Sequence, residues 1–112
     1  MSTDIQKRII NELLGIGYNI KYRGTQLLAE AICIAYESRN LAIVENLEKN
    51  IYVILAEKYN KSIECIKMDI ANATNIMYSV CEEKKMKAYF HIVDDYKPTP
   101  KYVIVIILSK IE

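Results

Sequence analysis

The sequence predicts a small all-α protein folded as one domain. Its 112 residues are 52% hydrophobic and 26% charged, an ordinary balance for a chain that buries a core. Over the first two thirds of the chain, apolar residues recur three and four positions apart, which places them on one face of a helix. Residue types that favour helix ends stand at the edges of these stretches, so each helix can be bounded.

The first two helices are expected at residues 4–14 and after Gly24 to about Glu37. Thr3 and Gln6 fit a capping box before the first helix, and glycines at 15 and 17 supply its stop. Two apolar stripes define these helices: Ile5, Ile9, Ile10, Leu13 and Leu14 in the first, and Leu27, Leu28, Ala31, Ile32 and Ala35 in the second.

Three further helices are expected in the middle of the chain. Residues 41–47 are moderately apolar and predict a short helix. We expect Asn50 to cap a helix that ends at residues 60–61, and Ser62 to cap another that continues to about Cys81. Their predicted inner faces are Ile51, Ile54, Leu55 and Tyr59, and then Ile63, Ile66, Ile70, Ala73 and Met77.

The last third of the chain gives mixed signals. Residues 88–95 favour an extended chain or a loop. Thr99 and Pro100 are typical of a helix start, with the threonine as cap and the proline at the first helical position. The following run, residues 102–108, has high β-propensity, and pattern alone does not decide between helix and strand for so short a run.

Composition narrows the class of protein. The formal net charge is +1, whereas a free-standing nucleic-acid binder is usually much more basic. Cys33, Cys65 and Cys81 lie far apart, which favours reduced thiols over a disulfide framework or a zinc site. The N-terminus is polar and the longest apolar run is too short to span a bilayer, so we expect a cytoplasmic protein without a membrane partner.

Residues 51–78 carry the most information about function. Two amphipathic segments are joined by the short polar sequence Asn60-Lys61-Ser62. So short a join forces the second helix to cross the first steeply, as in a helix-turn-helix, whose second helix can lie in the major groove of DNA. Many helical proteins contain such corners, so this spacing alone leaves DNA binding open.

Several stretches along the chain occur in an order seen in one known family. They are residues 9–17, Gly24 with Leu28, residues 30–32 and Tyr36, residues 51–52 and 55–60, and Pro98-Thr99. On these stretches the chain resembles the C-terminal effector domain of the sporulation initiation regulator, stage zero sporulation protein A, over nearly its whole length. The regulator's phosphate-receiving domain has no counterpart here, so we expect no control by phosphorylation.

The resemblance implies a fold of about six helices in which residues 102–111 are helical. It also implies a DNA-binding transcription regulator in sporulation or developmental control, with double-stranded DNA as partner and residues 62–79 as recognition helix. The implied DNA-binding residues are Lys58, Lys61, Ser62, Glu64, Lys67, Met68, Asn72 and Lys84. Among them Asn72 is suited to adenine and Met68 to a thymine methyl group, while Lys58 and Lys84 would contact phosphates.

The predicted recognition helix departs from the family pattern in its charge. No arginine occurs between residues 40 and 112, and arginine to guanine is the commonest specific base contact. Residues 62–79 hold two acids, Glu64 and Asp69, and one base, Lys67, so the helix has a net charge of −1. The alternative interpretation is therefore a degenerate helix-turn-helix that binds a partner protein, antagonises a full-length regulator, or forms a homodimer.

The remaining charged and potentially reactive residues do not indicate an enzyme. Lys84, Lys85 and Lys87 are interpreted as a charge-balanced helix end rather than a phosphate-binding patch. His91, the only histidine, has no partner at ligand spacing, and Asp94-Asp95 is more typical of a turn than of a divalent site. Because no phosphate-binding loop, nucleophile triad or pair of acids appears, we expect no catalysis, cofactor or metal.

Overall fold

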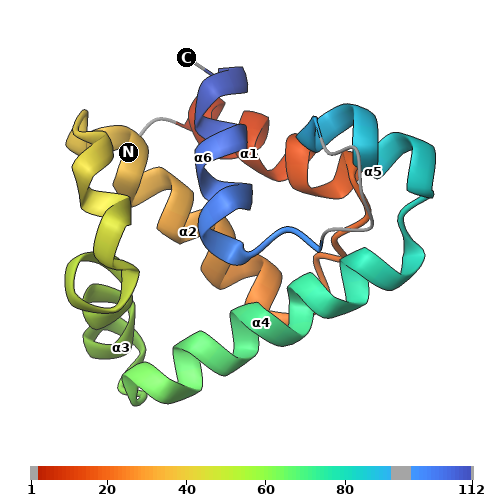
Figure 1. Ribbon diagram of the computed structural model, residues 1–112. Coiled ribbons are helices and arrows are strands. Elements are labelled where there is room, and N and C mark those ends of the chain that lie inside the picture. The colour runs from red at the N-terminus through yellow and green to blue at the C-terminus, as the bar shows by residue number, and fades with distance from the viewer. Residues whose placement is uncertain (1–2, 92–96, 112) are drawn as a thin grey trace.

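The computed structural model describes residues 3–91 and 97–111, and every regular element within them is helical (Figure 1). A 3₁₀ segment, η1 (Leu41–Asn46), and a π-helical turn, η2 (Glu48–Tyr52), connect α2 to α3. The expectation of an all-α fold with about six helices is confirmed. The α-helices are α1 (Thr3–Gly15), α2 (Arg23–Ser38), α3 (Val53–Tyr59), α4 (Ile63–Val80), α5 (Glu83–Phe90) and α6 (Pro100–Ile111).

Helix α2 is the centre of the fold. It packs against α1, α4 and α6, and its inner positions Leu28, Ala31 and Ile32 have no exposed surface. Its N-terminal end meets the middle of α4 (Figure 1). At this contact a Cβ atom added to Gly24 would lie 1.9 Å from the backbone oxygen of Asp69. Only glycine allows the two backbones to approach so closely, so residue 24 sets the distance between α2 and α4.

Helix α6 confirms the helical expectation for the final apolar run. It begins at Pro100, and the Thr99 Oγ1 atom accepts a hydrogen bond from the backbone N–H of Tyr102 at 3.2 Å. The β-branched residues that suggest a strand are instead held by burial against α1, α2 and η1. Tertiary packing therefore outweighs local propensity here. The buried positions are Val103, Ile104, Ile107, Leu108 and Ile111.

Helix α5 corrects the expectation of a loop or extended chain at residues 88–95. Residues 88–90 are the last turn of α5, and His91 ends it in the left-handed conformation with φ 56°. Phe90 is fully buried, and the Tyr102 hydroxyl donates a hydrogen bond of 2.6 Å to the Phe90 carbonyl. The Tyr89 hydroxyl donates to Glu12 Oε1 of α1 at 2.5 Å. These contacts come from distant parts of the chain; residues 92–95, with Asp94-Asp95, lie outside the described residues.

The segment before the short turn also differs from the prediction. Asn50 lies inside η2 and does not cap a helix; its side-chain Nδ2 donates instead to the Ile43 carbonyl at 3.0 Å. Ile54 and Tyr59 were expected inside but are 46% and 41% exposed. The wider π-helical turn shifts the phase of the buried face. The positions buried here are Ile51, Tyr52, Leu55 and Ala56.

The predicted inner stripe of α4 is confirmed, except that Ile63 is only half-buried. Ile66, Ile70, Ala73 and Met77 are all buried against the core. One polar pair also lies inside: the Tyr18 hydroxyl and Thr74 Oγ1 are hydrogen-bonded at 2.8 Å, and burial raises the pKa of Tyr18. In the part of the chain that the structure describes, no helix is both long and apolar enough to cross a membrane.

We predict that Gly24→Ala lowers the free energy of unfolding by at least about 2 kcal/mol, because the new methyl group collides with the backbone of α4. Chemical denaturation followed by circular dichroism measures this. Gly15→Ala is the matched control, since a Cβ there meets nothing within 4 Å and alanine favours the helix. Equal stability of the two variants would contradict the close contact.

Candidate nucleic-acid interface

Three residues join α3 to α4, and backbone hydrogen bonds fix their path. Asn60 adopts the left-handed conformation with φ 53°, which asparagine tolerates better than most residues. The N–H of Lys61 then reaches back to the Ala56 carbonyl at 2.9 Å, the bond that closes a Schellman-type helix end. Ser62 begins the next helix as predicted, since its Oγ accepts from the Cys65 N–H at 3.0 Å.

Helix α4 has a continuous exposed stripe opposite its buried face. In Figure 1 this helix runs along one edge of the molecule. The residues of the stripe are spaced three and four apart, so they lie in one row along the helix. This row, called the α4 stripe below, carries one acid, two amides, a hydroxyl and a thioether, and no cation of its own. It consists of Glu64, Met68, Asn72, Asn75 and Ser79.

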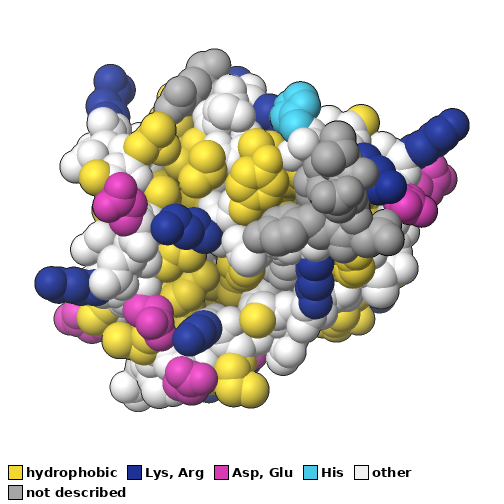
Figure 2. Space-filling model, viewed as in Figure 1, with side chains coloured by type: hydrophobic (Ala, Val, Ile, Leu, Met, Phe, Trp, Pro, Cys, Tyr) yellow, Lys and Arg dark blue, Asp and Glu magenta, His cyan; other side chains and the backbone are white. Residues whose placement is uncertain are grey.

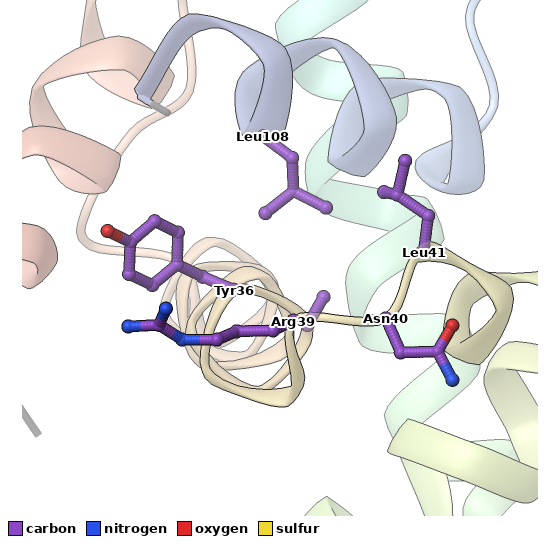
Figure 3. A pocket seen from close by; sticks show the side chains of 6 residues that line it. Tyr36, Arg39, Asn40, Leu41 and Leu108 are labelled. Carbon is purple, nitrogen blue, oxygen red and sulfur yellow. The ribbon is translucent and has the colours of Figure 1, made fainter.

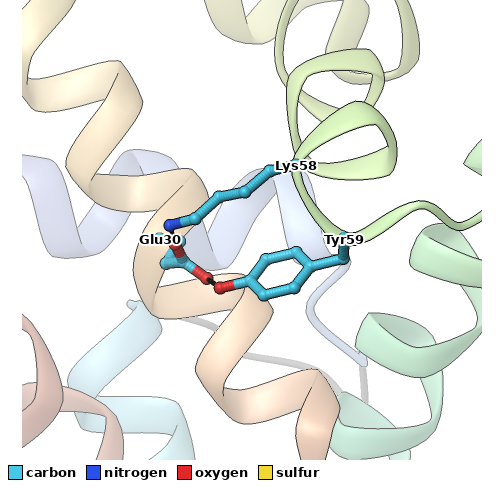
Figure 4. Close-up of polar contacts among 3 residues, drawn as sticks. All are labelled: Glu30, Lys58 and Tyr59. Atoms are coloured by element: carbon cyan, nitrogen blue, oxygen red, sulfur yellow. Dashed lines mark hydrogen bonds and ion pairs between the residues drawn. The ribbon is translucent and has the colours of Figure 1, made fainter.

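Two of the predicted DNA-binding lysines are paired with carboxylates. Lys58 Nζ donates to Glu30 of α2, and the Tyr59 hydroxyl donates to the other oxygen of the same carboxylate (Figure 4). The hydrogen bond and charge of Glu30 raise the pKa of Lys58. Lys67 Nζ lies 3.5 Å from Glu48 Oε1 of η2, with both side chains about half exposed, so this is a weak surface pair.

The other predicted residues lie in different surroundings. Lys61 and Ser62 are exposed in the turn, and Glu64, Met68 and Asn72 lie on the α4 stripe. Lys84 lies on α5, at the opposite end of α4 from the turn (Figure 1). Because α4 is about 27 Å long, Lys84 is well separated from Lys58 and Lys61. The structure thus places six of the eight predicted residues at the end of α3, in the turn or in the first half of α4. Asn72 lies at the middle of α4, and Lys84 lies apart.

The sequence analysis did not identify two cationic residues that lie beside α4. Lys97, before α6, donates a hydrogen bond to Asn75 Oδ1 and lies 5.6 Å from the centre of the Tyr78 ring. Arg23, at the start of α2, lies next to Gly24 and hence beside the middle of α4. Both reach α4 only through tertiary packing, so no spacing in the sequence relates them to it.

The surface seen in Figure 2 carries lysines, arginines and acidic residues interspersed, with no block of one sign. Its hollows are lined largely by hydrophobic side chains. A separate pocket of about 630 Å³ lies between the end of α2, the start of η1 and α6. In Figure 3 Tyr36 and Arg39 extend side by side from the end of α2, and Leu108 points toward them. Among the residues that the structure describes, the lining consists of Ala35, Tyr36, Arg39, Asn40, Leu41 and Leu108.

We predict that Ser62→Ala lowers the free energy of unfolding by about 1 kcal/mol, because the Cys65 N–H loses its acceptor. Thermal or urea unfolding measures the change. Ser79→Ala is the matched control: that exposed hydroxyl donates to the Ile76 carbonyl of its own helix and caps no backbone N–H of the described residues, so we expect a change below about 0.5 kcal/mol. A Ser62 variant as stable as the Ser79 variant would contradict the capping role.

Comparison with known proteins agrees with this architecture. The family model described as sporulation initiation factor Spo0A C terminal matches residues 9–111, which include all of α2 to α6 and most of α1. No curated protein sequence matches the chain significantly. Because the family match spans nearly the whole chain, the chain belongs to the family of Spo0A C-terminal effector domains.

Proposed function

We propose that the chain is a DNA-binding effector domain that regulates transcription in sporulation or a related developmental programme. The observation that carries this proposal is the family match across residues 9–111, which includes the whole unit of α3, turn and α4. In the proposal this unit is a helix-turn-helix, and α4 is the recognition helix that enters the major groove. The exposed α4 stripe supplies the surface that such a helix needs.

The side chains of the stripe suit particular base edges. The Asn72 amide can pair with both the N6 and N7 positions of adenine, and Met68 can contact a thymine methyl group. Glu64 can accept a hydrogen bond from the amino group of cytosine. With no arginine on α4, the common contact between arginine and guanine does not come from this helix. The proposed contacts therefore favour an adenine, a thymine and a cytosine at separate positions of the site.

Contacts to the DNA backbone come from the lysines near the turn in this proposal. Lys61 is exposed and makes no ion pair with any residue that the structure describes. Lys58 and Lys67 must exchange their carboxylate partners for phosphate oxygens, so each contributes less than an unpaired lysine. Lys84 at the far end of α4 is the weakest of the proposed contacts.

We predict that the chain binds duplex DNA at low salt and that the affinity falls as salt rises, because phosphate contacts release counterions. Asn72→Ala should reduce discrimination at one base pair by about 1–3 kcal/mol, whereas Lys67→Ala should weaken binding to all sequences alike. Selection from a random duplex pool, followed by fluorescence anisotropy across a salt series, measures both effects.

The matched control for these variants is Asn11→Ala, an exposed asparagine on α1, which should leave affinity and base preference unchanged. If the unmodified chain shows no binding at low salt, or binding that does not weaken with salt, the proposed function is wrong.

A second candidate function is binding of a partner protein through the same stripe, including a full-length regulator that the chain would antagonise. The observation that favours it is the charge of this surface: α4 carries no unpaired cation, since its single lysine is paired with Glu48. Under this alternative Asn72→Ala and Lys67→Ala leave DNA binding unchanged, and a partner that co-purifies with the chain is lost from the Met68→Glu variant.

A further inference from the structure

A small pocket lies beside the turn, between α2 and the start of α4. Its volume is about 220 Å³. Helix α2 contributes one side, and the turn with the first part of α4 contributes the other. We call it the flank pocket; it is lined by Arg23, Gln26, Leu27, Glu30, Tyr59, Lys61 and Ile66.

The charges of the flank pocket do not cancel. Glu30, the one carboxylate among the described residues that line it, is already engaged by Lys58 and by the Tyr59 hydroxyl (Figure 4). Its two cations, Arg23 and Lys61, make no ion pair within residues 3–91 and 97–111. After the Lys58–Glu30 pair is counted as neutral, the pocket therefore keeps two positive charges, and these attract an anion.

The position of Arg23 is fixed by its neighbour in sequence. Gly24 touches the Asp69 backbone, and consecutive Cα atoms lie about 3.8 Å apart, so Arg23 begins within a residue's length of α4. Asp69 follows Met68 of the α4 stripe directly in the chain. Arg23 therefore starts beside α4, and it lines the flank pocket together with Lys61 of the turn. This places two cations beside the α4 stripe, where a DNA backbone passes when a recognition helix lies in the major groove.

We propose that the flank pocket binds one phosphate group of the DNA backbone through Arg23 and Lys61. The inference rests on the proposed function and deepens it, because it names the cations that α4 itself lacks. A guanidinium group matches phosphate oxygens with two parallel N–H donors, and the lysine ammonium adds a second charge from the turn. This contact fixes the orientation of the domain on the duplex and reads no bases.

The test measures binding of a random-sequence duplex by fluorescence anisotropy across a salt series. Arg23→Gln and Lys61→Gln should each weaken binding about three- to tenfold for all sequences alike. Together they should reduce the slope of log affinity against log salt by about 0.9, the loss of one phosphate contact. Arg23→Lys keeps the charge and should recover most of the slope.

Glu30→Gln provides a test in the opposite direction. This change removes the one carboxylate that lines the flank pocket in the described part of the chain and releases Lys58, while the amide still accepts a hydrogen bond from Tyr59. Binding should become about two- to fivefold tighter and more dependent on salt. Arg8→Gln is the matched control, since this exposed arginine of α1 lines none of the pockets described here.

The outcomes separate this inference from the proposed function. If the unmodified chain binds DNA but Arg23→Gln and Lys61→Gln behave like Arg8→Gln, the flank pocket is not a phosphate site and the proposed function stands. If the unmodified chain binds no duplex at low salt, the proposed function fails and the inference fails with it. Circular dichroism and thermal unfolding of each variant exclude loss of fold as the cause of a weakened affinity.

Discussion

The backbone contact between Gly24 of α2 and Asp69 of α4 is the constraint on which the rest of the structure depends. It allows two long helices to pack almost without side chains between them at one point, since a Cβ at residue 24 would also lie 2.8 Å from the Ala73 Cβ. Away from that point, larger residues fill the diverging space, with Leu27 and Leu28 on α2 and Ile66 and Ile70 on α4. The contact fixes which face of α4 is buried and therefore which residues form the α4 stripe.

The same contact determines the electrostatics around α4. A helix that carries one lysine and two acids over residues 62–79 is a poor partner for phosphate by itself. Arg23 lies beside α4 because α2 begins in contact with that helix. Lys97 donates to Asn75 of α4 from the segment that precedes α6. The cations beside the stripe therefore belong to neighbouring elements, and the composition of α4 alone understates the positive charge near it.

Much of the fold was predictable from sequence because helix periodicity and capping are local. The spacing of Ile66, Ile70, Ala73 and Met77, the Ser62 cap and the Thr99–Pro100 start each rest on a few adjacent residues, and all were confirmed. The incorrect predictions concern segments whose structure depends on contacts with distant parts of the chain or on an unusual helical turn. Residues 88–90 are helical because Phe90 and Tyr89 are held by Tyr102 and Glu12, and Asn50 was misplaced because a π-helical turn has no recognised sequence signal. For the candidate site, sequence indicated exposed lysines near the turn, but Lys58 is paired with Glu30, 28 positions earlier in the chain.

In the Lys58–Glu30–Tyr59 cluster, the charge of a lysine near the turn is neutralised by a carboxylate from a helix that is distant in sequence. Glu30 ties the end of α3 to α2, so it supports the position of the turn and at the same time neutralises the nearest lysine. Under the proposed function, the ion pair that stabilises the fold is therefore also the one that weakens a phosphate contact of Lys58. Lys61 follows Tyr59 by two residues, after the left-handed Asn60, and it makes no ion pair among the described residues although it lines the same pocket as Glu30. Under the proposed function, Lys58 at the end of α3 therefore supports the fold, whereas Lys61 of the turn is available for phosphate. Arg23, which lines the same pocket as Lys61, comes from α2, the helix that also carries Glu30.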